Sequence, residues 1–390
     1  MSAADPPANG RRRSRRRLPA PEAPADVPGF PGVRLSVEQA DDSLREAARR
    51  LALPRSGWSR EPFSILAISG GAAGGAWGAG LLAGLTASGR RPNFAIVTGV
   101  STGAMIAPFA FLGSDWDDRL IDAYTGGHAA RLLGLGGLTR GFGPGLFRAE
   151  ALAALVGPFV DEAMLGAIAA EHARGRRLLV ATTDLDCERT CIWDMGAIAS
   201  VGGEAAVELF REVIVASASL PGIFPPRLFR VERDGEAFDE MHVDGGVSSP
   251  LFVLPEALLH SPRFGRRLRG GRIYVLVNTV LDVAPRTTSP SLAPVLARSF
   301  DTMLRFSYRQ ALATAAAFCA GAGAPMWVAS IPDAPGAANM MNFDTAAMRR
   351  MFERGLADGQ GDRPWRSPVS GRFAWRQLLE SLRPATGGAA

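Results

Sequence analysis

From about residue 63 onward, the hydrophobic positions follow two alternating patterns. Short, nearly unbroken apolar runs typical of buried strands are each followed by a longer run with helical spacing. The first two pairs are PFSILAIS with AWGAGLLAGLTASG, and FAIVTGV with TGAMIAPFAFLG. Further strands are predicted at 176–186, 191–195, 242–246, 272–279 and 325–331, and further helices within 115–176 and at 204–219, 251–259, 292–318 and 344–357. This alternation predicts a three-layer α/β/α fold with a mostly parallel central sheet.

The segments before this region have different patterns. Residues 1–33 are rich in Pro, Ala and Arg and include RRRSRRR, which predicts a disordered basic arm. Such an arm is either a solvated tail or a segment attracted to anionic lipid or nucleic acid. Residues 34–58 are predicted to be a helical N-terminal extension, because SVEQADDSLREAARRLA has an amphipathic pattern. Since no repeat or linker divides residues 59–385, we expect one α/β domain there.

Composition and cysteine usage limit the class of protein. The 390-residue chain is 47% hydrophobic and 21% charged, which indicates a globular protein with a sizeable core. Cys187, Cys191 and Cys319 are too few and too scattered for a disulfide framework or a structural zinc site. No apolar run reaches the ~18 residues of a membrane-spanning helix, and no secretory signal pattern follows the N-terminal arginines. We therefore expect a cytoplasmic protein that is at most peripheral at a membrane.

Lysine is absent from the sequence, so all 43 basic residues are arginine. This excludes a Walker-type phosphate loop, a Schiff-base lysine and a Ser-Lys catalytic pair.

The stretch VTGVSTGAM has the G-x-S-x-G pattern at a predicted strand-to-helix turn. A serine at such a turn adopts a strained backbone conformation that exposes its hydroxyl above the sheet edge. Gly99 and Gly103 permit the close approach of strand and helix that this turn needs. Ser101 is therefore the candidate nucleophile, whereas a merely tight packing turn is the alternative.

A second glycine-rich stretch, SGGAAGGAWGAG, lies at the preceding strand-to-helix turn. Its backbone amides could form a cup for an anion, and beside a serine such a cup is an oxyanion hole. The residues concerned are Gly70, Gly71, Ala72, Ala73, Gly74 and Gly75. A close helix crossing is the alternative, because small residues continue as far as Gly84. Dinucleotide binding fits poorly, since G-x-G-x-x-G is absent from the turn itself and no acidic residue ends a following strand.

The serine needs a base, and the chain contains only four histidines. His128 lies in a glycine turn and His172 in a charged helical stretch, while His260 could complete a Ser, Asp, His order. His242 lies two residues before Asp244 on a short predicted strand. Asp244 has the more distinctive setting, because MHVDGGVSSP places its carboxylate at a tight turn formed by Gly245 and Gly246. A carboxylate withdrawn from water could accept a hydroxyl proton, although Asp-Gly is also an ordinary turn signal.

These three motifs, in this order, resemble those of the patatin-like phospholipase family. The stretches ASASLPGIFPP and TTDLDCERTCIWDMGAIA also resemble middle segments of that family, so the likeness covers most of residues 61–360. The resemblance implies a patatin-like fold in which Ser101 is the nucleophile, Asp244 is its direct partner without histidine, and the 70–75 turn holds the oxyanion. It also implies a metal-independent and cofactor-free lipid acyl hydrolase.

The chain departs from the family pattern in the glycine-rich turn. The family sequence is typically Gly-Gly-Gly-x-Arg/Lys-Gly, whereas Ala72 replaces the third glycine and Gly74 replaces the basic residue here. Backbone donors survive both changes, but a cationic side chain near the oxyanion is lost. We expect the change to affect the rate and the preference for charged headgroups more than the chemistry.

Two other function classes remain open at this level. An acyltransferase would pass the same acyl group to an alcohol or lysolipid, and a non-catalytic module would only bind membranes or partners through the basic arm. The expected partner is a lipid or ester substrate, with peripheral membrane contact and no nucleic acid; the pattern does not indicate an oligomeric state. The segment LLGLGGLTRGFGPGLF could line or cover an apolar cleft, or be an ordinary surface loop.

Overall fold

The computed structural model describes residues 25–36, 64–133, 146–253, 271–333 and 340–368. Its strands are β1 Arg34–Ser36, β2 Ser64–Ile68, β3 Ile96–Val100, β4 Arg177–Asp184, β5 Arg189–Asp194, β6 Arg227–Arg233, β7 Glu236–Asp244, β8 Arg272–Val277 and β9 Met326–Ser330. Its helices are α2 Gly75–Ala87, α3 Thr102–Leu112, α4 Asp117–Thr125, α5 His128–Leu133, α6 Ala149–Val156, α7 Glu162–Ala173, α8 Met195–Val201, α9 Gly203–Ser217, α12 Leu292–Ala322 and α13 Thr345–Gln360. Most elements therefore agree with the hydrophobic pattern.

The central sheet has the order β1-β5-β4-β3-β2-β8-β9. Strands β4, β3, β2, β8 and β9 are parallel, which confirms the predicted parallel centre. Antiparallel strands are added beside β4: β5 pairs along one edge of β4, and β7 pairs with its last three residues and also forms a hairpin with β6. Because β3 and β7 both pair with β4 on the edge opposite β5, the end of β3 and the end of β7 meet there.

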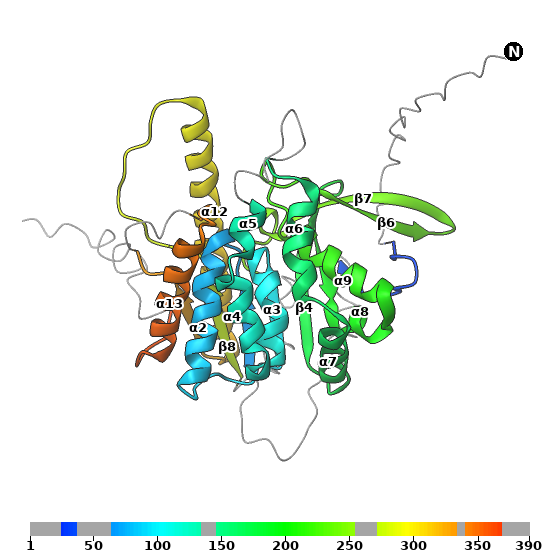
Figure 1. Ribbon diagram of the computed structural model, residues 1–390, viewed down its shortest axis with the longest axis horizontal. Helices are drawn as coiled ribbons and strands as arrows, with labels where there is room; N and C mark the ends of the chain where they lie inside the picture. Colours follow the sequence, from blue (N-terminus) through cyan, green and yellow to red (C-terminus); the bar gives the residue numbers. More distant parts are fainter. Residues whose placement is uncertain (1–24, 37–63, 134–145, 254–270, 334–339, 369–390) are drawn as a thin grey trace, which may run out of the picture.

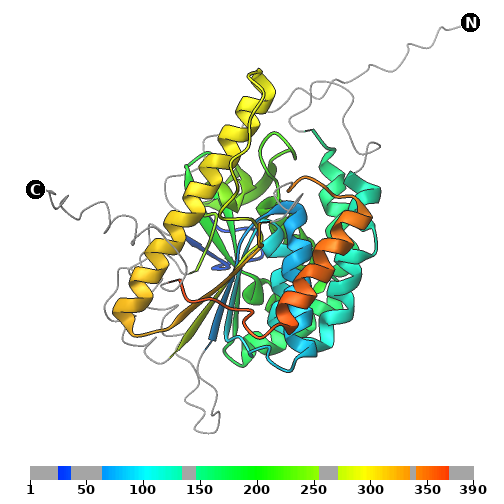
Figure 2. The same cartoon turned by 90° about the vertical axis from the view of Figure 1, so that its left-hand side faces the viewer.

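Two hydrophobic cores cover the two faces of the sheet. Helices α2, α3, α9 and α13 pack on one face, and the C-terminal half of α12 packs on the other (Figure 2). The strands between them are buried over nearly their whole length, as expected for parallel strands covered on both sides. The predicted three-layer α/β/α fold with a mostly parallel central sheet is thereby confirmed (Figure 1).

The N-terminal prediction needs correction. Residues 25–33, assigned above to a disordered arm, belong to the folded unit, because Ala25, Phe30 and Val33 are buried in the main core. Residues 34–36, assigned to a helical extension, form β1, which pairs with β5 and is itself the edge strand. Contacts with the rest of the fold hold both segments in place, and such contacts leave no periodic pattern in the sequence. Residues 1–24 of the predicted arm lie outside the described residues, and so does the predicted helix at 36–52 beyond Ser36.

The sequence pattern also missed several short elements. The β6–β7 hairpin was represented only by the predicted strand at 242–246, and α8 was not predicted. Strand β7 ends at Asp244, after which Gly245–Val247 form one turn of 3₁₀ helix. In the predicted helix at 251–259, Leu251 to Val253 are not helical, and the rest lies outside the described residues.

Glycines bring α2 and α13 into close contact. A methyl group added at Gly80 or Gly84 would collide with backbone atoms of α13, and one added at Gly355 or Gly359 would collide with α2. The close helix crossing considered for the glycine-rich stretch is therefore real for its helical part, since no side chain fits between the two backbones.

We predict that Gly355→Ala destabilises the protein, because its Cβ would fall on the carbonyl oxygen of Trp77. The free energy of unfolding, measured by urea denaturation, should decrease by about 1–3 kcal/mol. Gly166→Ala in α7 is the matched control, because an added Cβ there meets no atom within 4 Å. That variant should gain up to about 1 kcal/mol from helix propensity, and equal effects of the two changes would contradict the packing argument.

Candidate functional site

Ser101 occupies the sharp turn between β3 and α3. Its backbone has φ 57° and ψ −126°, a conformation that is rare for a residue with a side chain. A Cβ at Gly99 would lie 2.6 Å from the carbonyl oxygen of Gly103, and a Cβ at Gly103 would lie 2.6 Å from that of Ser69. Glycine is thus required on both sides of the serine, and α3 begins directly at Thr102 with its N-terminus beside the hydroxyl.

Asp244 reaches Ser101 because the two strands that end beside them share an edge of β4. Val100 pairs with Ala181, and Asp244 pairs with the next residue, Thr182. The Ser101 hydroxyl donates a hydrogen bond to the Asp244 carboxylate, which also accepts the Gly246 amide at 2.7 Å. The structure therefore brings together the serine and the carboxylate that the sequence motifs singled out.

The Asp244 carboxylate is only 2% exposed. This burial raises its pKa from 3.8 to about 7, and the hydrogen bonds from Ser101 and Gly246 only partly oppose the effect. A carboxylate with a pKa near neutrality is well suited to accept a proton from a hydroxyl and return it within one cycle.

Two serines at the C-terminal end of α9, Ser217 within the helix and Ser219 just after it, hold the backbone of this pair. The Ser217 hydroxyl accepts the Ser101 amide at 3.0 Å and donates to the Ala181 carbonyl at 2.7 Å. The Asp244 amide donates to the Ser219 carbonyl at 3.0 Å. The sequence motifs did not indicate a role for these serines. Their only signal was the ASAS stretch, in which small hydroxyl residues follow an amphipathic helix.

Only part of the predicted oxyanion turn has free amides. The Ala73 amide donates to the Met340 carbonyl at 3.0 Å, the Gly74 amide to Gly71 at 2.9 Å, and the Gly75 amide into the same 3₁₀ turn. These three amides are engaged, so the prediction is corrected for Ala73, Gly74 and Gly75. The remaining predicted donors, Gly70, Gly71 and Ala72, line the same cavity as Ser101.

Asn278, which follows β8, fixes the conformation of this turn. Its amide and side-chain nitrogens donate to Ser69 at 3.0 and 2.9 Å. A Cβ at Gly71 or Gly74 would collide with the Asn278 carbonyl, so neither position can carry a side chain. The missing basic residue at Gly74 is therefore a packing requirement in this chain.

None of the described histidines lines the cavity that contains Ser101. His128 contacts Asp122 at 3.1 Å, and His172 contacts Asp194 at 3.5 Å. His260 lies outside the described residues.

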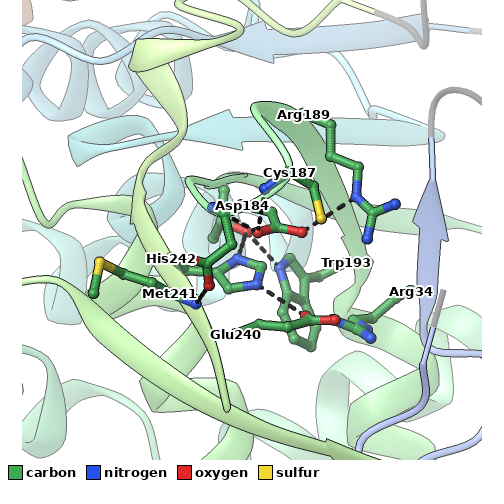
Figure 3. A network of polar contacts seen from close by, with 10 residues as sticks. Arg34, Asp184, Cys187, Arg189, Trp193, Glu240, Met241 and His242 are labelled. Carbon is green, nitrogen blue, oxygen red and sulfur yellow. Dashed lines mark hydrogen bonds and ion pairs between the residues drawn. The ribbon is translucent and has the colours of Figure 1, made fainter. Parts of the chain in front are cut away.

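His242 belongs to a separate buried network beneath β7 (Figure 3). The Trp193 indole donates to the Thr182 hydroxyl at 2.8 Å, and that hydroxyl contacts His242 Nδ1 at 2.8 Å. His242 Nε2 lies 3.3 Å from Glu240, which also pairs with Arg34 of β1. The pKa of Glu240 falls to about 2, because its hydrogen bonds and charge interactions with His242 and Arg34 outweigh the burial that would raise it. His242 thus supports the strand that ends at Asp244 and does not contact Ser101.

The candidate nucleophile lies in the wall of a cavity of about 990 Å³. Its lining is mainly apolar and includes Met105, Leu220, Phe224, Leu304 and Met340. Cavities of this size and character are typical of sites for small organic ligands. The glycine- and leucine-rich segment predicted as a cover lies outside the described residues from 134 to 145, and α12 is the long element that borders the cavity instead.

Arginines enter this cavity from elements that the motifs did not indicate. Arg286, Arg298 and Arg305 line it, and Asp301 pairs with Arg305 at 2.9 Å and with Arg286 at 3.5 Å. A cationic contribution is therefore present near the site, although Gly74 does not supply it. Within the described part of the chain, no cluster of three or more His, Cys, Asp or Glu side chains could hold a metal ion.

We predict that Ala72→Gly stabilises the protein. Ala72 has φ 46°, a left-handed conformation that glycine adopts without a Cβ penalty. The free energy of unfolding should rise by about 0.5–1 kcal/mol. The neighbouring change Ala73→Gly should lower it by a similar amount, because Ala73 has no such strain, and a loss at both positions would contradict the interpretation.

Ionisation of Asp244 should lower the free energy of unfolding of the protein. The folded state binds more protons than the unfolded state between pH 4 and pH 7, because the folded pKa is about 7 and the ordinary value 3.8. Stability from this group is therefore present at low pH and is lost as the pH rises to about 7. Asp244→Asn should be more stable than the parent at pH 8, on the order of 3 kcal/mol, and the difference should vanish near pH 4. A difference independent of pH, in melting curves, would contradict this assignment.

Comparison with known proteins agrees with the motifs. Residues 66–256 match the family model described as Patatin-like phospholipase, and this segment contains the glycine-rich turn, Ser101 and Asp244. A search of curated proteins found no match. The crystal structure of VipD from Legionella pneumophila is similar at 12% identity, over 77% of this chain and 68% of that chain, with a TM-score of 0.33. So distant a structural likeness supports no statement on this protein's mechanism. By the matching family model and the ordered motifs, residues 66–256 are a patatin-like phospholipase domain.

Proposed function

We propose that this protein hydrolyses carboxylic esters of lipids through a Ser101–Asp244 dyad and an acyl-enzyme intermediate. The patatin-like phospholipase domain at residues 66–256 supports lipid acyl hydrolysis in general. The observation that carries the finer proposal is the hydrogen bond from the Ser101 hydroxyl to a buried carboxylate, in the wall of a largely apolar cavity.

In the first step, Ser101 Oγ attacks the ester carbonyl carbon while Asp244 accepts the hydroxyl proton. The tetrahedral intermediate then collapses, the C–O bond to the alcohol breaks, and Asp244 returns the proton to the leaving oxygen. A water molecule attacks the acyl-serine in the second step, with Asp244 again accepting and returning a proton. The fatty acid leaves, and Ser101 is regenerated.

The amides of Gly70, Gly71 and Ala72 are proposed to stabilise the oxyanion, because they border the cavity beside Ser101 and the neighbouring amides are engaged. The N-terminus of α3 adds a favourable dipole at the same point.

The dyad predicts the outcome of point substitutions. Ser101→Ala and Asp244→Asn should each lower kcat for p-nitrophenyl butyrate and for a phospholipid by at least about 10³-fold. His128→Ala and His260→Ala should retain activity, because neither histidine has a role in the mechanism. Fluorophosphonate labelling, read by mass spectrometry, should modify Ser101 alone. Loss of activity in His260→Ala with an active Asp244→Asn would overturn the dyad in favour of a Ser-His-Asp triad.

The pKa of Asp244 predicts the pH dependence of the rate. Only the ionised carboxylate accepts the serine proton, so kcat/KM should rise as the pH increases through about 7 and then level off. Initial rates with p-nitrophenyl butyrate between pH 5 and pH 9 test this. A rate unchanged between pH 5.5 and pH 8 would contradict a base with this pKa. Product analysis with added glycerol or lysolipid tests whether the acyl group goes to an alcohol, which would assign an acyltransferase.

A further inference from the structure

The N-terminal half of α12 stands clear of the body of the protein (Figure 2). Among its described side chains from Leu292 to Leu304, none is buried, and the first buried one is Arg305. The second half of the same helix packs on the sheet through Tyr308, Leu312 and Cys319. One rigid helix thus anchors in the core and extends its first turns into solvent.

The exposed half of α12 carries a continuous apolar stripe. It contains six of the thirteen exposed large hydrophobic side chains of the described residues: Leu292, Val295, Leu296, Phe300, Met303 and Phe306. Their spacing of three to four residues places them on one side of a helix. With a rise of 1.5 Å per residue, the stripe is about 20 Å long. An exposed apolar face of this size on a helix marks an interaction surface.

This stripe is continuous with the opening of the cavity. Leu296 and Phe300 are exposed and also line the cavity, at 59% and 40% exposure. Val247 and Met341, on other elements that line the cavity, are exposed as well. Whatever covers the stripe therefore lies directly over the route to Ser101.

The charged side chains beside the stripe favour an anionic membrane surface as its binding partner. Four arginines lie on or beside the exposed part of α12: Arg286, Arg298, Arg305 and Arg309. Asp301 pairs with Arg305 and Arg286, and Asp282 pairs with Arg309, so the arginines outnumber the aspartates that pair with them. Arg309 also lies over the ring of Phe306, 5.5 Å from its centroid. Apolar side chains bordered by arginines suit a membrane interface, where the apolar groups enter the acyl layer and the cations meet phosphates. A second protein seated on this stripe would instead block the cavity.

Among the described helices, no single one is long and apolar enough to cross a bilayer, and only the bent pair Glu150–Phe159 and Glu162–Ala173 meets that test jointly.

We propose that the stripe on α12 docks the protein on an anionic lipid surface and presents the cavity opening to the lipids beneath it. This inference rests on the proposed function for the identity of the substrate but on the stripe alone for membrane binding. Lipid esters would then enter the cavity without crossing water.

The test compares vesicle binding with hydrolysis of a soluble ester. Met303→Ser with Phe306→Ser removes two apolar side chains that do not line the cavity. In co-sedimentation with phosphatidylcholine vesicles containing 30% phosphatidylglycerol, this variant should bind about tenfold more weakly than the parent, with p-nitrophenyl butyrate turnover retained. Leu228→Ser, which is similarly exposed on β6, is the matched control and should change neither.

The same measurement in a Ser101→Ala background separates the two proposals, because docking should persist even if the chain hydrolyses no ester. Equal vesicle binding of the Met303/Phe306 variant and the parent would overturn the docking proposal. A parent dimer that the variant converts to a monomer, with no vesicle binding by either, would also overturn it and assign the stripe to a second copy of this chain.

A second inference concerns Tyr308, which lies in α12 outside the matched family segment. A methyl group on Gly70 Cα would lie 3.1 Å from the Tyr308 hydroxyl oxygen and 3.5 Å from Ser101 Oγ, so both oxygens face the same small space. Tyr308 is 5% exposed and lines the cavity. Burial raises its pKa further above the ordinary value, so the phenol keeps its proton.

We infer that Tyr308 is an additional catalytic residue that donates a hydrogen bond to the oxyanion. Ser69 has two acceptors within reach, the Gly70 carbonyl at 2.7 Å and the phenol oxygen. When its hydroxyl turns to the phenol oxygen, the Tyr308 hydrogen is free to face the reacting ester. A donor from α12 would then supplement the three free amides of the turn.

Tyr308→Phe should lower kcat by about 10²-fold with little change in KM. Because the phenol stays protonated, the loss should be the same from pH 6 to pH 9, and it should be equal for p-nitrophenyl and alkyl esters. Tyr274→Phe, another buried tyrosine, is the control and should keep full activity. A loss confined to alkyl esters would overturn the oxyanion role and assign Tyr308 to the leaving oxygen, and unchanged kcat would overturn any catalytic role.

Discussion

The site depends on the length of β4. This strand extends beyond the end of β3, and its last three residues are paired by β7, which runs in the opposite direction. Val100 and Asp244 consequently face consecutive residues of one strand, and the turns that follow them meet. Ladder hydrogen bonds therefore set the separation of a serine and a carboxylate that are far apart in the sequence, and the rest of the site is arranged around this point.

Rigid backbone supports keep that geometry against strain. Ser101 has a backbone conformation that a free chain rarely adopts, and its amide is held by Ser217. Asp244 is held through its own amide by Ser219, and β7 is anchored below by the network of Glu240, His242 and Arg34. Removing one member of such a buried charged set leaves the others unpaired and is strongly destabilising. The N-terminal strand β1 thus contributes to the site through Arg34, although it lies at the far edge of the sheet.

Helix α12 adds features that the matched family segment does not contain. Its inner half covers one face of the sheet, its middle lines the cavity with Tyr308 and arginines, and its outer half carries the apolar stripe. These roles follow from one continuous helix of 31 residues that passes over the cavity and projects beyond the fold. Arginines on and beside α12 also line the cavity, and they supply the positive charge that a basic residue in place of Gly74 would have provided.

The sequence by itself determined the fold class, the turn around Ser101 and the motif ending in Asp244, because hydrophobic period and glycine spacing are local properties. The tertiary structure alone decided which turn amides are free, since the partners of Ala73 and the obstacle at Gly74 come from Met340 and Asn278. It also decided the place of residues 25–36, the hydrogen bonds of Ser217 and the position of Tyr308 beside Ser101. These depend on contacts between distant segments, and such contacts leave no periodic or compositional signal in a single chain.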